Sequence, residues 1–438
     1  MPPPPLPDRL SVIRPVAAVL FLLAGVGLFG PLYVRYFRPP DGLTADFIQK
    51  AERPVYAVIT PQTIDQAQPA LDKGAKGLIL EGDFPQDHAL KAFAEIRPRL
   101  RLDFDAPIIA TAQAVWPGIN VHDDQAAEAA PSGGPWIDTN AGYLRFARAL
   151  AKPGAELWLA NRPPAKTAVT VARYLQVIAD AAIIGTRWVI ALDDDFFARL
   201  QANDAKAVEG WRKINEALAF YEAHAAWRDL QPWGQLAVVQ DIDSGGLLSG
   251  GILDMISVKH TPLVPVPKSR LSPGQFKGTR MTVNVDTGAL TEAQRDALRQ
   301  FTRGGGMLLS GPPGWRMPPP RVDQITLDKT EITKLEDIWK EVNAMTGRRN
   351  LGVRLFNVSS MLSNLTATPD GNRLVLHLVN YSDYPVDSIT VHVLGQYPKA
   401  TLVTPAGERA LKTYDNEDGS GVDIDTIDFY ATLILERN

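Results

Sequence analysis

Acidic side chains directly follow several of the short apolar runs that predict β-strands in this chain. Glu81 and Asp83 come after GLIL, Asp138 lies in WIDTN, and Asp193 to Asp195 come after WVIAL. If these strands are parallel neighbours, their carboxyl ends meet at one edge, and two facing carboxylates could act as general acid and base. Asp is also favoured there as a turn former or helix cap, and one of Asp193 to Asp195 is expected to cap a helix beginning at FFARL.

Several other kinds of chemistry are excluded by composition. The chain has no cysteine, which rules out a thiol nucleophile, a disulfide and a thiolate metal site. Its six histidines form neither an HExxH motif nor a cluster, so neither a metal nor another cofactor is expected. The net charge of −4 comes with no basic stripe, so no nucleic-acid partner is expected.

From Val55 to about Leu230, apolar runs alternate with helical patterns. The runs 55–60, 77–82, 107–115, 156–160 and 187–193 are rich in β-branched residues, and helical patterns such as 88–96, 142–151 and 170–185 separate them. Buried parallel strands read as continuous apolar runs. The pattern predicts a (β/α) barrel that is trimmed, because about 175 residues fall short of the roughly 250 typical of a complete one. A long helix over 204–230 follows, and its aromatic stripe is expected to pack against the next domain.

Residues 231–345 predict a second, flavodoxin-like α/β domain. Strand patterns at 235–241, 263–267 and 280–286 are followed by a helix from 290 whose Thr291 and Gln294 fit a capping box. The glycines at 304–306 follow a helix and precede a strand, the reverse of a phosphate cradle, so they predict a helix end. From 346 to 438 the period changes to strict alternation, which predicts a C-terminal antiparallel β-sandwich.

The N-terminal segment Pro15 to Val34 contains twenty residues without a charge, about the length of a bilayer-spanning helix. Bulky residues after Leu28 argue against a cleaved signal peptide. We expect a single transmembrane anchor in the inner (cytoplasmic) membrane, with residues 1–14 as a proline-rich cytoplasmic tail, 35–54 as a linker and the bulk of the chain in the periplasm. Lipid-facing or helix-facing contacts are assigned to Val19, Phe21, Gly25 and Phe29. The expected partners are the lipid bilayer and other integral membrane proteins, contacted through residues 1–34.

Two motifs carry a resemblance to a known family. LTEAQRDALRQFTRGGGMLLSG and LVLHLVNYS, placed after a barrel-like region, resemble the barrel glycoside hydrolases of the β-galactosidase type and their uncharacterised relatives. In that family the barrel is followed by a glutamine-amidotransferase-like domain and a β-sandwich. The resemblance covers most of residues 55–438, with the three units at 55–230, 231–345 and 346–438.

The resemblance implies a site with two carboxylates facing a sugar of a polysaccharide. The matching positions at strand ends supply candidate catalytic residues, namely Glu81, Asp138, Asp193 and Asp194. Asn161 and Arg162 are candidates for contacts to sugar hydroxyls. Three indole rings are candidates for stacking on a sugar ring: Trp116, Trp136 and Trp158.

Two functions remain open from the sequence. The chain lacks the Asn-Glu pair that many retaining barrel glycosidases carry at a strand end, and a full set of strands is not evident. The favoured interpretation is therefore a degenerate glycoside-hydrolase scaffold that serves as a structural or binding subunit of a membrane complex. The alternative is a membrane-anchored glycoside hydrolase acting on envelope or exported polysaccharide, with Asp193 or Asp194 opposite Glu81 or Asp138.

Overall fold

The computed structural model describes the chain almost continuously from residue 139 onward, over 139–159, 167–188, 192–240, 259–285, 290–312, 329–358 and 360–437. Before residue 139 it describes short segments within 32–129. The predicted span 15–34, with Val19, Phe21, Gly25 and Phe29, lies outside the described residues up to Pro31, and Leu32 to Val34 begin a strand rather than ending a helix. Within the described segments, no helix combines the length and the apolar character that crossing a bilayer requires.

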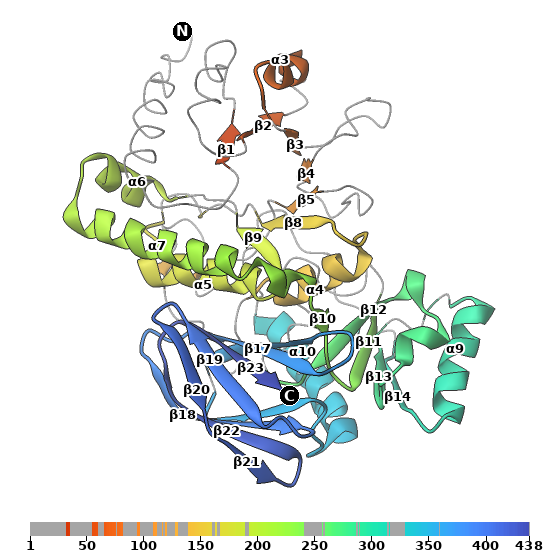
Figure 1. The fold of residues 1–438 in the computed structure, drawn as a ribbon. Helices are drawn as coiled ribbons and strands as arrows, with labels where there is room; N and C mark the ends of the chain where they lie inside the picture. The colour runs from red at the N-terminus through yellow and green to blue at the C-terminus, as the bar shows by residue number, and fades with distance from the viewer. Residues whose placement is uncertain are drawn as a thin grey trace.

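A parallel sheet forms the first unit (Figure 1). Its strands lie side by side in chain order: β1 (Leu32–Arg35), β2 (Val55–Ile59), β3 (Gly77–Glu81), β4 (Ala94–Ile96), β5 (Ile108–Thr111), β8 (Glu156–Leu159) and β9 (Thr186–Trp188). Parallel strands paired in sequential order are the arrangement of a (β/α) barrel. All five predicted strands are confirmed in the described residues, and β1 and β4 are additional. Between β5 and β8 the two-residue strands β6 (Ile119–Asn120) and β7 (Glu128–Ala129) pair separately.

Strand β4 corrects the helix predicted over 88–96. Ala94 pairs with Ile79 of β3, and Ile96 pairs with Ala110 of β5. A three-residue strand inserted between two neighbours is decided by pairing across the sheet, which overrides the local helical spacing of the apolar residues. Among the other helices of this unit are α3 (Ala67–Asp72), α4 (Ala141–Leu150), α5 (Val171–Ala182), α6 (Asp194–Gln201) and α7 (Ala205–Ala223).

Helix α7 carries the predicted aromatic stripe and ends at Ala223, short of the predicted 230. The core-packing role of the stripe is confirmed, but its partner is the sandwich rather than the next domain along the chain. Trp211, Phe220 and Tyr221 are buried, and the rings of Phe220 and Tyr221 lie 5.3 and 5.2 Å from Tyr430 of the sandwich. Trp227, in the 3-10 turn η2 (Ala225–Asp229), lies 5.3 Å from His377. Burial lowers the pKa of His377 to about 3, so its neutral ring packs in the apolar layer between the units.

The middle unit is a parallel sheet in the order β12-β11-β13-β14. The strands are β11 (Leu236–Gln240), β12 (Leu263–Pro267), β13 (Met281–Asn284) and β14 (Met307–Ser310). Numbered along the chain this is the order 2-1-3-4 of a flavodoxin-like sheet. Helix α9 (Glu292–Arg303) starts at the predicted capping box of Thr291 and Gln294, and helix α10 (Lys329–Thr346) leads to the last unit.

The last unit consists of two antiparallel sheets, as predicted. The first contains β10 (Gln231–Pro232), β16 (Met361–Ala367), β17 (Arg373–Asn380), β23 (Tyr430–Glu436), β19 (Lys399–Thr404) and β20 (Gly407–Leu411). The second contains β15 (Val353–Phe356), β18 (Val386–Leu394), β22 (Gly419–Ile427) and β21 (Thr413–Asn416). Strand β10 joins its sheet from far away in sequence, because Gln231 pairs with Ala367.

Gly210 of α7 offers a test of this packing. A Cβ there would lie 2.6 Å from Val171 Cγ2 and 3.2 Å from Phe196 Cε2, so α7 approaches α5 and α6 closely only because the side chain is absent. We expect Gly210→Ala to lower the free energy of unfolding by about 1–3 kcal/mol, although alanine favours helix. Urea unfolding measures the change. The exposed Lys206→Ala in the same helix is the control, and stabilisation by Gly210→Ala would contradict the close approach.

Candidate functional site

The carboxylate of Asp193, one of the candidate catalytic residues, is fully used in hydrogen bonds to the protein. Asp193 is 4% exposed and caps α6, with Oδ1 accepting the Phe196 amide at 2.9 Å. Oδ2 accepts the Tyr174 hydroxyl at 2.7 Å and the Val169 amide at 3.3 Å. The expectation that one aspartate of this run caps a helix is confirmed, and this arrangement leaves Asp193 directed at the protein rather than at a ligand.

The next two aspartates lie in the first turn of α6, and both are exposed. The Asp195 carboxylate accepts from Arg199 Nε at 2.9 Å. Acidic residues in a first turn are favoured by the positive end of the helix dipole. This placement gives Asp194 and Asp195 a structural role on the helix without requiring a substrate.

The two described tryptophan candidates are packed inside the protein. Trp116 is 0% exposed and meets the Tyr174 ring edge-on at 5.6 Å. Trp158 is 2% exposed, and its Nε1 donates to Glu156 at 2.9 Å. Neither ring presents a face on which a sugar could stack, because both are closed off from solvent. Burial of this cluster also raises the pKa of Tyr174.

Glu81 is the final residue of β3, at the carboxyl end where a barrel site would lie. The structure describes its backbone only. The remaining candidates, Asp138, Trp136, Asn161 and Arg162, lie outside the described residues.

A buried carboxylate that sequence reasoning missed organises the residues directly after Asp138. Asp180 of α5 is fully buried and accepts the Asn140 amide at 2.8 Å, Asn140 Nδ2 at 3.0 Å and the Tyr381 hydroxyl at 2.6 Å. The Thr139 hydroxyl is a fourth donor. Burial raises the pKa of Asp180, and the four hydrogen bonds oppose that rise. Asp180 therefore joins α5, the start of α4 and the sandwich.

The same face of α5 carries two more polar contacts to the sandwich. Arg173 donates to Asp383 at 2.6 Å and to the Tyr381 carbonyl at 3.3 Å. Gln176 donates to the Asn380 carbonyl at 3.2 Å. Positions 173, 176 and 180 lie along one side of a helix, so a single polar stripe fixes the orientation of α5 against the loop 380–383.

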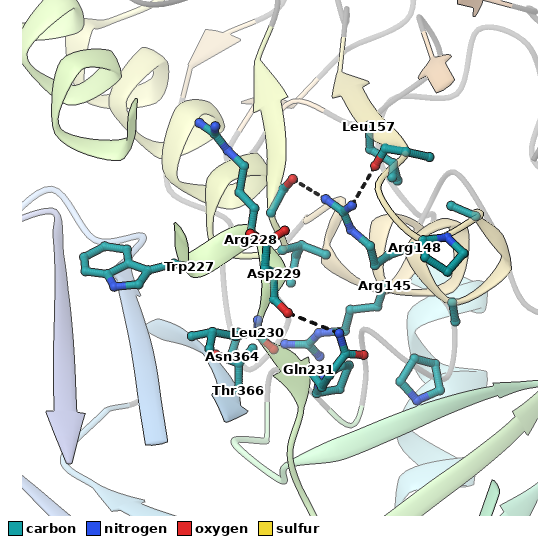
Figure 2. A pocket seen from close by; sticks show the side chains of 18 of the residues that line it. Arg145, Arg148, Leu157, Trp227, Arg228, Asp229, Leu230, Gln231, Asn364 and Thr366 are labelled. Carbon is teal, nitrogen blue, oxygen red and sulfur yellow. Dashed lines mark hydrogen bonds between the residues drawn. The ribbon is translucent and has the colours of Figure 1, made fainter. Parts of the chain in front are cut away.

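A cavity of about 820 Å³ lies at the amino ends of strands β8 and β9 (Figure 2). The candidates Glu81 and Asp193 lie at the carboxyl ends of the strands instead. The lining of the cavity includes Glu156 and Leu157 at the amino end of β8, and Gly185 and Arg187 at the amino end of β9. The other lining residues include members of α4, η2, β10, β12 and β16 together with Arg270 and Gln275, so all three units contribute. Barrel glycosidases place their site at the carboxyl ends of the strands, so this cavity is a different place from the predicted site.

Arginines hold the walls of the cavity. Arg148 donates to the carbonyls of Ala155, at 3.0 Å, and Gly185. Arg270 donates to the carbonyls of Ala149 and Leu150 at 2.5 and 2.6 Å, at the end of α4. The one sequence signal was the pair Arg145 and Arg148, one turn apart in the otherwise apolar GYLRFARALA.

No protein-family model and no curated protein sequence matches the chain. Among solved structures, an α-L-fucosidase from Paenibacillus thiaminolyticus aligns with TM-score 0.49 and 10% identity over 68% of this chain and 62% of its own. A rhamnosidase from Novosphingobium sp. PP1Y gives 0.43 and 10% over 90% and 38%. A β-galactosidase from the psychrophilic Marinomonas ef1 gives 0.40 and 13% over 90% and 66%.

The three solved structures are glycoside hydrolases. This is the class that the sequence resembles. The chain spans less than two thirds of the lengths of these three enzymes. At such identities and TM-scores the likeness carries no argument about activity or substrate, which have to be argued from the residues of this chain. Among the described residues, no group of three or more acidic or histidine side chains is placed to hold a metal ion.

Asp180 predicts a pH-dependent stability. Because its pKa is raised in the folded state, its contribution is fully present below the unfolded value of about 3.9 and is lost as the pH rises through the folded pKa. Asparagine does not titrate, and the Nδ2 that replaces Asp180 Oδ2 cannot accept the two Asn140 N–H groups that this oxygen accepts. We therefore expect Asp180→Asn to cost about 1–3 kcal/mol at low pH, and the cost to shrink as the pH rises. Urea unfolding from about pH 4 to 7.5 measures this, with exposed Asp195→Asn as control. A cost that grows with pH would contradict the assignment.

Replacement of Gly185, at the wall of the cavity, is expected to destabilise the fold. The φ of Gly185 is +75°, and an added Cβ would lie 2.9 Å from Arg148 Nη2 and 3.3 Å from the Arg228 Cα. Gly154 has φ +81° with open space around it. Both alanine variants should lose about 1 kcal/mol from the left-handed backbone, and Gly185→Ala a further ~1–3 kcal/mol from crowding. Equal thermal destabilisation of the two variants would show that Arg148 moves away without cost.

Proposed function

We propose that this chain is a non-catalytic protein on a glycoside-hydrolase-like scaffold, serving as a binding or structural subunit of a membrane protein complex. The proposal rests on the burial and hydrogen bonding of the Asp193 carboxylate. Both oxygens of its carboxylate accept hydrogen bonds from the protein, and the group is buried. A catalytic carboxylate must face the scissile bond, with its partner about 5 Å away for retention or about 6.5–9.5 Å for inversion.

The buried indoles support the same proposal. A glycosidase of this type needs a face on which a sugar ring can lie, and Trp116 and Trp158 are enclosed by the packing around Tyr174 and Glu156. Packing of this kind stabilises a scaffold and does not serve turnover. A subunit that contacts other proteins needs a stable surface but not an open catalytic site.

The proposed location is the inner membrane, with the three units in the periplasm. The support is the uncharged sequence that follows Arg14, from Pro15 to Pro31, ahead of strand β1. Integral membrane proteins are the proposed partners, contacted through residues 1–34. The small residues Ala24, Gly25 and Gly27 would allow close approach of another helix.

One observation favours a second candidate, a glycoside hydrolase acting on envelope or exported polysaccharide. Glu81 ends β3 at the carboxyl edge of the sheet, and Asp138 directly precedes the segment that Asp180 holds. These two carboxylates form the remaining pair to test, and Asp194 is a third candidate.

The first test is hydrolysis of aryl glycosides by the full-length protein in mild detergent. We expect no turnover above that of the buffer. Turnover that falls at least a hundredfold in Glu81→Gln or Asp138→Asn, with unchanged thermal unfolding, would replace the first proposal by the second. Asp193→Ala should instead lower stability by about 1–2 kcal/mol through loss of the cap, with exposed Asp195→Ala as the matched control.

The second test is the composition of the purified particle. Gentle extraction of the native membrane should yield a stoichiometric complex, measured by size-exclusion chromatography with mass determination. Replacement of Gly25 by isoleucine should reduce the yield of that complex, because the added side chain separates packed helices. A monodisperse single chain from native membrane, together with turnover, would sink the subunit proposal.

A further inference from the structure

We propose that the cavity between the three units binds a small organic anion, a sugar acid or sugar phosphate in size and chemistry. We refer to it as the arginine cavity. Its cationic lining consists of Arg145, Arg148, Lys152, Arg187, Arg228 and Arg270. Figure 2 shows the side chains of Arg145 and Arg148 extending from α4, whereas the side chain of Arg228 on η2 extends away from them.

The lining of the arginine cavity is net positive, whereas the chain as a whole is net negative. Among the described lining residues, six carry a positive charge and two, Glu156 and Asp229, carry a negative one, an excess of four in a chain whose net charge is −4. Glu222, behind the wall, pairs with Arg187 and Arg228 and reduces the excess to three. Clefts lined by one sign of charge between low-dielectric walls focus the field and attract ions of the opposite sign.

Within the described part of the chain, two guanidinium groups have only backbone carbonyls as hydrogen-bond acceptors. Arg148 donates to the carbonyls of Ala155 and Gly185, and Arg270 to those of Ala149 and Leu150. The end of a helix such as α4 supplies only about half a negative charge, so a cation there keeps part of its field. Burial is also the main cause that lowers the pKa of Arg148, and the nearby carboxylates of Asp229 and Glu156 oppose that effect only in part. A bound anion would supply the remaining compensation.

The size and the remaining lining define the ligand class. About 820 Å³ lies in the range of small-molecule sites and is far below that of a folded partner. Gln231, Asn364 and Thr366 offer polar groups, and Pro153, Pro265 and Trp227 offer apolar surface. A molecule with one or more acidic groups on a hydroxyl-bearing ring matches both. Arginine recognises carboxylate and phosphate with the same fork geometry, so the two acid types share this site chemistry.

The proposal does not depend on the carboxyl edge of the sheet or on the absence of catalysis there. It predicts binding at the amino ends of β8 and β9, which an aryl-glycoside assay does not report. Failure of one proposal therefore leaves the other standing.

Isothermal titration calorimetry on the full-length protein in detergent, at about 20 mM salt, tests the assignment. The probes are digalacturonate, glucose 6-phosphate and the neutral galactobiose. We expect at least one acidic probe to bind and galactobiose not to bind. We also expect the affinity for the acid to fall about tenfold in Arg270→Gln, and to fall further at about 200 mM salt. Arg270 is exposed, so its replacement tests charge with little risk to folding.

The matched control is Arg212→Gln, an exposed arginine on α7 that pairs with Glu209 and Glu216. It removes one positive charge from the protein without touching the cavity, and the affinity should not change. Binding of glucose 6-phosphate alone assigns a phosphate ligand, and binding of digalacturonate alone assigns a carboxylate ligand. The proposal is overturned if neither acid binds at millimolar concentration, if galactobiose binds equally well, or if Arg212→Gln weakens binding as much as Arg270→Gln does.

Discussion

The buried carboxylate of Asp180 is the constraint on which the arrangement of the described units depends. A carboxyl group with no exposed surface has to be hydrogen-bonded, or the fold loses several kcal/mol. Its donors come from Thr139 and Asn140 ahead of α4 and from Tyr381 beyond β17. None of these segments is near α5 in sequence. The carboxylate is satisfied only when the barrel-like unit and the sandwich are docked, so the two are expected to form as one cooperative block.

The arginine cavity is a consequence of the same docking. Asp180 fixes the start of α4, and Arg270 of the middle unit binds the carbonyls at its end. Between them α4 lies against β12, and the space left beside its last turn is the cavity. The positive charge therefore gathers where three surfaces meet, and it lies away from the edge at which the sequence placed a sugar.

The sequence predicted the features that are written in local patterns. The five barrel strands, the capping box at Thr291, the sandwich and the packing role of the α7 stripe all follow from periodicity or from a cap motif. Strand β4 was missed because a three-residue strand is too short to show alternation, whereas the residues before it have the spacing of an amphipathic helix. The burial of Trp116 and Trp158 depends on tertiary packing, which the local sequence around each residue does not reveal. The cavity was invisible because its arginines at 145, 187, 228 and 270 belong to separate segments.

Strand β10 changes how the units can be separated. Gln231 and Pro232 pair with β16, and the Trp233 amide donates to the Leu365 carbonyl at 3.0 Å before the chain enters the middle unit. An added Cβ on Gly371 would lie 2.8 Å from the Trp233 ring, so this indole packs directly on the sandwich. The sandwich is thus discontinuous in sequence, and the flavodoxin-like unit is an insertion within it. A sandwich fragment that begins at residue 346 would lack β10, which leaves β16 as an edge strand unpaired on one side, and would lose Trp233 from the sandwich core. The two ends of the inserted unit lie together, because the Gln235 amide donates to the Leu351 carbonyl, so this unit could be replaced by another domain.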